Sequence, residues 1–578
     1  MPGAAKYPAM VRGAALVVFL ALLAGAVSAL QRPAATGAPG RVTLSIVGTT
    51  DVHGRVFPRG GRGGVAQLGG YLRNLRAARD GDGGAVLLLD AGDTFQGGIE
   101  SNLSEGALVV DAYNALGYDA LAIGNHEFDY GALDTAAGDD SPPDMRGALK
   151  AAAARARFPF LAANLIDEVT GRPVAWPNVR PSTVVDAAGL RVGIVGVMTW
   201  DGLRMTLAAN VQGLRTPPLA PAVEAEARRL RQRGVDVVVV LAHAGGWCAR
   251  LDDPADLSSC DDDGEIFRLA RHLPAGLVDA IVAGHSHAAV AHVVAGIPIV
   301  QAYSRGAAFA RLDLTVERGA GVVSARVFAP QALCAAVGPD GACAASGAPP
   351  RYEGAPVEPD TSVTAAMRPE LDRVYRWREA SLGVVLETSL TRNGEGLESP
   401  LGNLFADAFL AAVPGADAAI GMGARRGGLR TDLPAGALTR GPLYDVFPFD
   451  NRVVALVLTG TQLQQVLARE VSRRRRGVPS VSGIRVRVTC AGERPEVEIA
   501  RSSGTRIDPA EALVVATTDS FAARARFGAR ATVTATAPQV RDAVAGWLTA
   551  RGGRLRAADL ADPPRWQPLD GAACLATD

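Results

Sequence analysis

The sequence lacks an excess of charge of either sign. Lysine and arginine total 59, aspartate and glutamate also total 59, and the formal net charge of the 578 residues is zero. Proteins that bind nucleic-acid polymers usually carry a basic excess, so this balance disfavours such a partner. One basic run, Arg473–Arg476, follows a predicted helix and is typical of a solvated surface segment.

Long apolar runs are scarce as well. Beyond the N-terminal region no segment reaches the roughly 20 apolar residues that a bilayer span needs. In that region Lys6 and Arg12 precede a short apolar run, 14–26, which is followed by "AVSA" ending at Ala29. This pattern predicts a signal peptide over residues 1–29, and hence an exported protein, periplasmic or secreted, with no transmembrane anchor after cleavage.

CxxC spacing, typical of zinc and redox sites, is absent among the six cysteines, which favours a structural role. Nearest-neighbour pairing would give three disulfides, although several connectivities fit the sequence: Cys248–Cys260, Cys334–Cys343 and Cys490–Cys574. The acidic segment between the first two cysteines lacks the spacing of an EF-hand. We expect a solvated disulfide loop there rather than a calcium site.

Internal repeats and long low-complexity tracts are also missing, and what remains is an alternation of short β-branched runs with helical patterns. This alternation predicts an α/β fold with largely buried strands. The chain is too long for one ordinary core. We expect a first domain over 41–330, a linker over 331–382 that contains a connecting helix (363–379), and a second α/β domain over 383–565.

Histidine is rare, with seven in the chain, yet five of the seven lie at or just after the ends of predicted strands. Ligands of open α/β sheets bind at that edge. Carboxylates and one amide accompany these histidines, and the full set is Asp51, His53, Asp93, Asn125, His126, Asp129, His243, His285 and His287. The two other histidines, His272 and His292, lack such neighbours, and we expect them to be structural or surface residues.

Imidazole, carboxylate and amide ligands suit zinc, manganese, cobalt or iron rather than copper. We predict two divalent cations bridged by Asp93, because one carboxylate offers two oxygens. The first cation would bind Asp51, His53, Asp93 and His287, and the second Asp93, Asn125, His243 and His285. Such a pair clamps both oxygens in phosphoryl transfer and lowers the pKa of a bridging water to supply hydroxide.

The segments "DVH", "GDTFQGG", "GNHEFDYG", "LAHAGG" and "GHSHA", in this order, resemble the motifs of calcineurin-like metallophosphoesterases, in particular the exported 5′-nucleotidase and UDP-sugar hydrolase branch. The resemblance implies a four-layer αββα domain followed by an α/β substrate-binding domain. It also implies that His126 is not a metal ligand but faces the phosphoryl group, held by Asp129, while Glu127 has a supporting role.

The second domain resembles the family's nucleotide-binding domain. The resemblance implies that Arg430 in "GGLR" contacts substrate and that Phe449 in "PFDN" and, less closely, Phe521 in "TTDSFAA" stack on a base. Three features depart from the family. Arg425 and Arg426 replace an expected asparagine segment, Arg392 is only the nearest counterpart of another arginine, and the sugar-binding "GGDGF" segment is missing. Added arginines such as Arg425 and Arg392 would suit further phosphates.

The sequence therefore predicts a metal-dependent phosphoric ester hydrolase that acts on a nucleotide or a nucleotide-derived small molecule. Two alternatives use the same scaffold: a UDP-sugar pyrophosphohydrolase and a 2′,3′-cyclic-nucleotide phosphodiesterase. An alternative of another class is a nucleotide-binding protein without catalytic activity.

Overall fold

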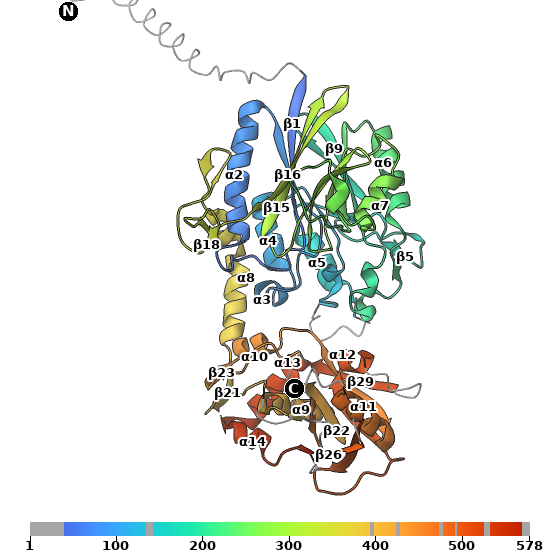
Figure 1. Cartoon of the computed structure of the whole chain (residues 1–578), viewed down its shortest axis with the longest axis vertical. Helices are drawn as coiled ribbons and strands as arrows, with labels where there is room; N and C mark the ends of the chain where they lie inside the picture. Colours follow the sequence, from blue (N-terminus) through green and yellow to red (C-terminus); the bar gives the residue numbers. More distant parts are fainter. Residues whose placement is uncertain are drawn as a thin grey trace, which may run out of the picture. The chain divides into compact units, whose positions relative to one another are not determined.

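The computed structural model describes residues 40–133, 143–393, 398–423, 428–472, 478–491, 494–524 and 532–568. The chain divides into two compact units, Met1–Met367 and Arg368–Asp578 (Figure 1). The division falls within helix α8 (Thr361–Glu379), which is the helix expected at 363–379. The predicted signal peptide (1–29) and the basic run Arg473–Arg476 lie outside the described residues.

The first unit contains two large mixed sheets. Their strand orders are β16-β15-β1-β2-β3-β4-β7 and β13-β14-β12-β11-β9-β8. Strands β1 to β4 and β7 are parallel, as are β9, β11, β12 and β14. Antiparallel strands lie at the other edges, β15 and β16 in the first sheet and β13 and β8 in the second. In chain order the strands are β1 (Arg41–Thr49), β2 (Ala85–Asp90), β3 (Ala120–Ala122), β4 (Phe160–Leu161), β7 (Val179–Arg180), β8 (Ser182–Ala187), β9 (Leu190–Met198), β11 (Val237–His243), β12 (Ala280–Ala283), β13 (Ala289–Val294), β14 (Ile297–Ala302), β15 (Ala308–Glu317) and β16 (Gly321–Ala332).

The two sheets pack on each other, and helices cover their outer faces. The run "VVVVLA" in strand β11 is apolar throughout because both faces of this strand are buried. Val237, Val239 and Leu241 lie in the core between the sheets, whereas Val238 and Val240 lie in the core beneath helices α6 (Leu219–Gln232) and α7 (Glu265–His272). On the other side, α2 (Val65–Asp82) contacts β1 and β2. The layers are therefore αββα, as the resemblance implied (Figure 1).

Shorter elements complete the first unit. These are α3 (Ile99–Asn102), α4 (Ala107–Leu116), the 3₁₀ turn η2 (His126–Phe128), α5 (Gly147–Arg155), β5 (Ile166–Asp167), β6 (Arg172–Pro173), η3 (Gly202–Arg204), η4 (Ala208–Val211), β10 (Leu214–Arg215), η5 (Leu257–Ser259), β17 (Ala336–Val337), β18 (Cys343–Ala344), β19 (Arg351–Tyr352) and β20 (Ala355–Pro356).

The second unit has a central five-stranded sheet in the order β25-β22-β28-β24-β29, with a separate core on each face. Strand β24 alternates between these cores, since Val453 and Ala455 face one and Leu456 and Leu458 the other. Helices α9 and α13 form the first core; α11 and the small sheet β27-β26-β31 form the second.

The bounds in the second unit are β21 (Ser381–Leu386), α9 (Pro400–Ala412), β22 (Ala418–Gly423), β23 (Gly436–Thr439), α10 (Arg440–Val446), β24 (Arg452–Thr459), α11 (Gly460–Ser472), β25 (Pro479–Ser482), β26 (Ile484–Ala491), β27 (Arg494–Arg501), β28 (Ala512–Thr518), α12 (Asp519–Arg524), β29 (Thr532–Gln539), α13 (Val540–Arg551), β30 (Gly553–Leu555), α14 (Ala557–Ala561) and β31 (Trp566–Pro568).

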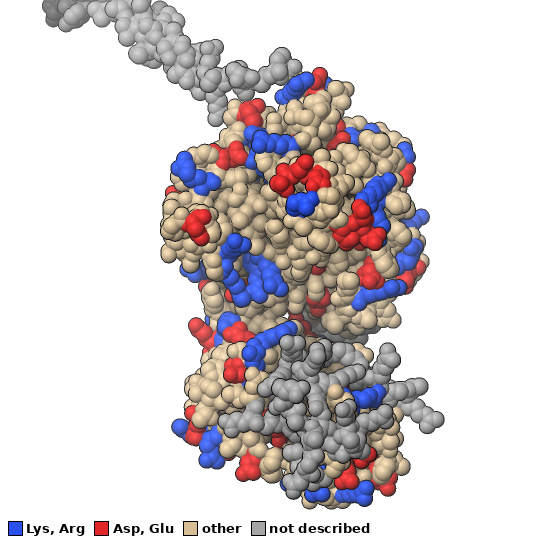
Figure 2. Space-filling view, in the orientation of Figure 1, with Lys and Arg blue, Asp and Glu red and all other residues tan. Residues whose placement is uncertain are grey.

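Two disulfides join nearest-neighbour cysteines, Cys248 to Cys260 and Cys334 to Cys343. The third expected pair involves Cys574 and the side chain of Cys490, which lie outside the described part of the chain. Within the described ranges, none of the helices combines the length and the hydropathy needed to cross a bilayer. Acidic and basic side chains are interspersed on the face drawn in Figure 2, in keeping with the balanced charge.

Candidate active site

The carboxyl ends of the parallel strands bring the predicted ligands together. Asp51 and His53 follow β1, Asp93 follows β2, and His243 is the last residue of β11. Backbone hydrogen bonds fix the loops to one another: Asp51 N donates to Gly92 O at 2.9 Å, and His53 N donates to Asp93 O at 3.0 Å. The two sheets thus contribute their ligands to one edge.

Two groups of ligand atoms form there, and they share Asp93. One group contains Asp51, His53, Asp93 and His287, and the other contains Asp93, His243 and His285; within each group the ligand atoms lie within 4.8 Å of one another. The first group contains the four residues predicted for the first cation, and the second group contains three of the four predicted for the second. Asn125 adjoins the second group, since its Oδ1 lies 3.2 Å from His243 Nε2.

The distances within the groups suit cation binding. The Nε2 atoms of His53 and His287 lie 2.9 Å apart, and His243 Nε2 lies 3.1 Å from His285 Nδ1. Paired imidazole nitrogens this close, next to carboxylate oxygens, need a shared proton or a cation. Carboxylate, imidazole and amide donors are those that zinc, manganese and iron accept. The residues present therefore fit a divalent metal centre.

Hydrogen bonds orient two of the histidines. His53 Nδ1 lies 2.8 Å from Gln96 O, and His243 Nδ1 lies 2.8 Å from Ala91 O. A backbone carbonyl only accepts, so Nδ1 carries the proton in both rings and Nε2 presents its lone pair to the site. These two carbonyl acceptors could not be predicted from the sequence, because they depend on how the loops fold.

Five of the ligand residues have positive φ angles: Asp51 (50°), His53 (50°), Asp93 (54°), His285 (76°) and His287 (56°). Residues other than glycine adopt this left-handed region at a cost of about 1–3 kcal/mol each, and such residues concentrate at functional sites. Four of the ligand residues are also buried: Asp51 and His243 are 0% exposed, and Asp93 and Asn125 are 2% exposed. The His287 side chain, by contrast, is 42% exposed. Packing and hydrogen bonds hold the ligands in these conformations.

His126 lies beside the ligand groups with its own carboxylate partner. Its Nδ1 is 2.5 Å from Asp129 Oδ2, and its Nε2 is 4.0 Å from Asp93 Oδ2. Burial lowers the pKa of His126, but the hydrogen bond to Asp129 and the charge of Asp93 outweigh this effect and raise the pKa to about 9. The side chain is 30% exposed, so His126 can reach a substrate.

The turn that carries His126 is η2, in which residues three apart come together, so the expected contact with Asp129 forms. Asn125 precedes this turn, but its side chain makes no capping hydrogen bond. Its Oδ1 is therefore free to face His243.

Two supporting residues complete the site. Glu127 is buried, and its carboxylate accepts from the backbone N–H groups of Asp93 (2.9 Å), Thr94 (2.6 Å) and Gly124 (2.6 Å). Burial and the charge of Asp93 raise the pKa of Glu127. Thr206 Oγ1 donates to Asp129 Oδ1 at 2.8 Å. The sequence flagged Glu127 only through its motif, and it did not flag Thr206, which lies far from Asp129 along the chain.

In the second unit, three of the predicted substrate residues lie together. The Arg430 guanidinium is 4.8 Å from the centre of the Phe449 ring, and Arg392 donates from Nη1 to Arg430 O at 2.6 Å. The Arg392 guanidinium thus supports the loop that carries Arg430. The predicted substrate residue Arg425 lies outside the described part of the chain.

Phe449 and Phe521 lie on segments that hydrogen bonds connect. Asn451 Nδ2 donates to Asp519 Oδ1 at 2.7 Å, and Arg452 N donates to Asp519 Oδ2 at 3.0 Å. Both phenylalanines are partly buried at the margins of a core, Phe449 at the core that contains α9 and α13 and Phe521 at the core that contains α11. Each keeps some exposed ring surface, which a wholly internal side chain would not.

Comparisons with known proteins agree with this architecture. The calcineurin-like phosphoesterase family matches residues 44–289, and the 5′-nucleotidase C-terminal domain family matches residues 381–529. The chain is 26% identical to Endonuclease YhcR of Bacillus subtilis over 539 residues, 88% of this chain and 39% of that protein. It is 29% identical to the 5′-nucleotidase of Vibrio cholerae over 300 residues, 48% of this chain and 49% of that protein.

The chain thus spans half or less of the length of these two relatives. Among solved structures, the 5′-nucleotidase precursor of Thermus thermophilus is 24% identical with a TM-score of 0.53, covering 91% of this chain and 99% of that one, which shows a shared fold. The family matches in both units assign the chain to the calcineurin-like metallophosphoesterases that carry a 5′-nucleotidase C-terminal domain.

Proposed function

We propose that this chain is an exported phosphoesterase that uses two divalent cations to hydrolyse phosphate esters of nucleotides. Enzymes of its family are phosphoric ester hydrolases that depend on divalent metals. The observation that carries the proposal is that the buried Asp93 belongs to two neighbouring groups of candidate ligands. When bound, the cation pair would neutralise phosphoryl charge and supply a nucleophilic water of lowered pKa.

The chain's own residues would complete the reaction. Asp51, Asp93, Asn125 and the histidines of both groups would fix the cations, and the hydrogen bonds of His53 and His243 would keep their lone pairs directed inward. His126, protonated and held by Asp129, would stabilise charge on the phosphoryl group and donate a proton from Nε2 to the leaving oxygen.

The second unit would bind the nucleoside part of the substrate. Phe449 offers a partly exposed ring for stacking on a base, with Arg430 against that ring. Stacking of a base on an aromatic side chain contributes about 1–3 kcal/mol in nucleic-acid complexes. Phe521 and Arg425 remain proposed substrate residues, and Arg392 is proposed to act through the Arg430 loop.

Export is part of the proposal. The pattern of residues 1–29 supports it, as do two disulfides, because disulfides persist in oxidising compartments.

A substrate panel with metal-depleted enzyme tests the proposal. Phosphate release from AMP, ATP, UDP-glucose and 2′,3′-cyclic AMP is measured before and after addition of Zn²⁺, Mn²⁺ or Co²⁺. We expect no activity without metal and restored hydrolysis of AMP with it. A preference for UDP-glucose or the cyclic nucleotide would indicate the diphosphate or cyclic-ester alternative, and hydrolysis of none of the four with any metal would contradict the proposal.

A further inference from the structure

His292 on β13 is a buried histidine that the active site does not use. It is 0% exposed, and its Nε2 has no hydrogen-bond partner among the residues that the structure describes. The Ala291 N–H makes a long contact of 3.3 Å with Nδ1. Burial lowers the pKa of His292, so the ring is neutral, the form that binds metals. A buried imidazole nitrogen without a partner is costly, and a packing role alone does not explain it.

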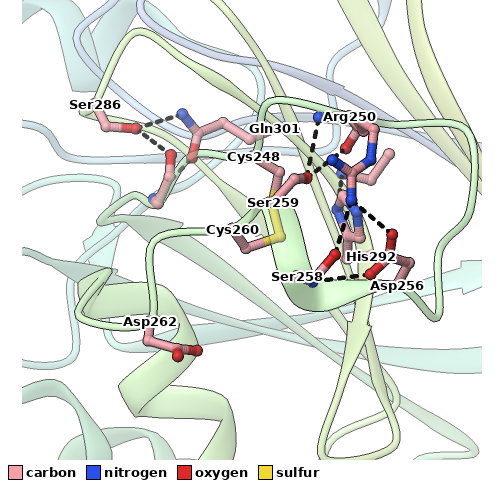
Figure 3. The surroundings of a disulfide bond; sticks show 12 residues. Cys248, Arg250, Asp256, Ser258, Ser259, Cys260, Asp262, Ser286, His292 and Gln301 are labelled. Atoms are coloured by element: carbon pink, nitrogen blue, oxygen red, sulfur yellow. Dashed lines mark hydrogen bonds and ion pairs between the residues drawn. A yellow bond between two sulfur atoms is a disulfide. The ribbon is translucent and has the colours of Figure 1, made fainter.

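The Cys248–Cys260 disulfide lies beside this imidazole (Figure 3). The two sulfur atoms and one ring nitrogen of His292 lie within 4.8 Å of one another. Two thiolates and an imidazole are a ligand set that zinc binds in proteins, with solvent able to fill a fourth position. In the oxidised chain the sulfurs are bonded to each other, so this set is complete only when the disulfide is reduced.

The backbone would keep the two cysteines close after reduction. Cys248 and Cys260 form an antiparallel bridge, and Ala249 N donates to Ser259 O at 3.0 Å. The loop is also anchored to the strand that carries His292, because Cys248 N donates to Ala289 O at 3.2 Å and Val293 N donates to Pro254 O at 2.8 Å. None of these contacts depends on the S–S bond.

The surrounding charge favours a cation. Asp252, Asp253 and Asp256 of the same loop act electrostatically on His292 in the direction that stabilises positive charge. Arg250 offsets part of this, since its Nη2 pairs with Asp256 Oδ2 at 2.9 Å (Figure 3). The charge of a divalent cation is balanced by two thiolates, so binding adds no net charge to the buried site. The acidic side chains of the loop keep their own negative charge, which attracts the incoming ion.

We propose that Cys248, Cys260 and His292 form a second, redox-dependent metal site that binds zinc or a similar thiophilic divalent cation in the reduced chain. A dithiol reductant supplies two electrons and two protons: the S–S bond breaks, two thiols form, and the dithiol becomes a disulfide. The cation then displaces the two thiol protons to solvent as two metal–sulfur bonds form, and the imidazole nitrogen supplies a third bond. Oxidation would release the ion.

Cobalt absorption tests this site separately from the catalytic centre. The chain is reduced with dithiothreitol, freed of the reductant under nitrogen and titrated with Co²⁺ while the thiolate-to-cobalt charge-transfer band is recorded. The catalytic ligands are oxygen and nitrogen atoms, so they do not contribute to this band. We expect the band in the reduced chain, no band in the oxidised chain, and loss of the band on reoxidation.

The second disulfide provides a matched control. The Cys334→Ser/Cys343→Ser variant should keep the band after reduction, whereas Cys248→Ser/Cys260→Ser should lose it. His292→Ala keeps both cysteines, and we expect its cobalt affinity to fall at least about tenfold. A band of equal strength in Cys248→Ser/Cys260→Ser, or an unchanged cobalt affinity in His292→Ala, would overturn the proposal. If a variant fails to fold, the comparison of the oxidised and reduced forms of the unaltered chain still tests it.

Discussion

His126 lies close enough to the ligand groups to act on a substrate without being a ligand. Replacing it with alanine should leave both cations bound and lower kcat by about 10²–10⁴-fold, because the variant loses a positioned proton donor. Steady-state kinetics and metal analysis of the same preparation check this. His272→Ala is the matched control, since His272 is exposed and its ring forms a hydrogen bond with Arg268 O of its own helix. An unchanged kcat in His126→Ala would remove this residue from the mechanism.

Asp93 is the residue that the two ligand groups share. Asp93→Asn removes the negative charge and one metal-binding oxygen, so we expect the purified variant to contain less metal than the unaltered chain and to need more added metal for activity. Elemental analysis of the protein measures the effect. Asp186→Asn, which changes an exposed carboxylate on β8, should retain full metal content. Equal metal in both variants would contradict the bridging assignment.

At the level of single residues, the sequence was enough to propose the seven candidate ligands, because each follows a short apolar run and is of a metal-binding type. The positive φ angles of Asp51, His53 and Asp93 could not be found in this way, because no glycine marks these positions. Thr206 was missed for a different reason. A threonine on an exposed loop has no signature, and only the fold brings it to Asp129.

Among the structural elements, the loops after β2 and β3 are joined by Glu127, whose carboxylate accepts three backbone N–H groups. Glu127→Gln replaces one acceptor oxygen with an N–H₂ group that faces N–H donors. We expect a lower Tm and a metal affinity about 10–100-fold weaker, as for other residues that orient metal ligands. Metal titrations followed by activity and thermal unfolding measure both effects, and an unchanged affinity would make Glu127 dispensable to the site.

The residue just before β3, Asp119, carries a carboxyl group that should make stability depend on pH. Burial raises the pKa of Asp119 to about 6, although its carboxylate accepts from Leu88 N at 2.8 Å. A folded-state pKa above the unfolded value means that stability decreases as pH rises from about 4 to about 6. The cost at neutral pH is up to about 3 kcal/mol.

Asp119→Asn keeps an acceptor for Leu88 N and cannot ionise. We therefore expect the variant to have a higher free energy of unfolding than the unaltered chain at pH 7.5 and a similar one at pH 4. Urea unfolding at the two pH values measures the difference. An equal increase in the free energy of unfolding at pH 7.5 and at pH 4 would show that ionisation of Asp119 is not the cause.

At the scale of the whole molecule, we expect the first unit to hydrolyse the phosphate ester and the second unit to bind the nucleoside. Phe449→Ala in the second unit should raise KM for AMP about tenfold or more, because base stacking is lost, and should change kcat little. Hydrolysis of p-nitrophenyl phosphate, which has no base, should be unaffected. Equal losses of activity on AMP and on p-nitrophenyl phosphate would show that Phe449 stabilises the fold rather than binding the nucleoside.

Much of the overall architecture could be predicted because local signals were strong. The alternation of runs predicted largely buried strands, and β11 is buried over its whole length. The helix expected at 363–379 formed as α8, which begins slightly earlier at Thr361. The pairing of strands that are distant in the sequence could not be predicted. Strand β15 pairs with β1 although more than half of the first unit's sequence lies between them, and no local pattern specifies this partner. The domain bounds 41–330 and 383–565 and the substrate role of Arg425 stay predictions.

Anomalous scattering from crystals grown with excess Mn²⁺ tests the central claim most directly, because it locates cations without reference to activity. We expect two peaks per chain on opposite sides of Asp93, one among Asp51, His53 and His287 and the other among Asn125, His243 and His285. A single peak away from Asp93, or no peak near these side chains, would contradict it.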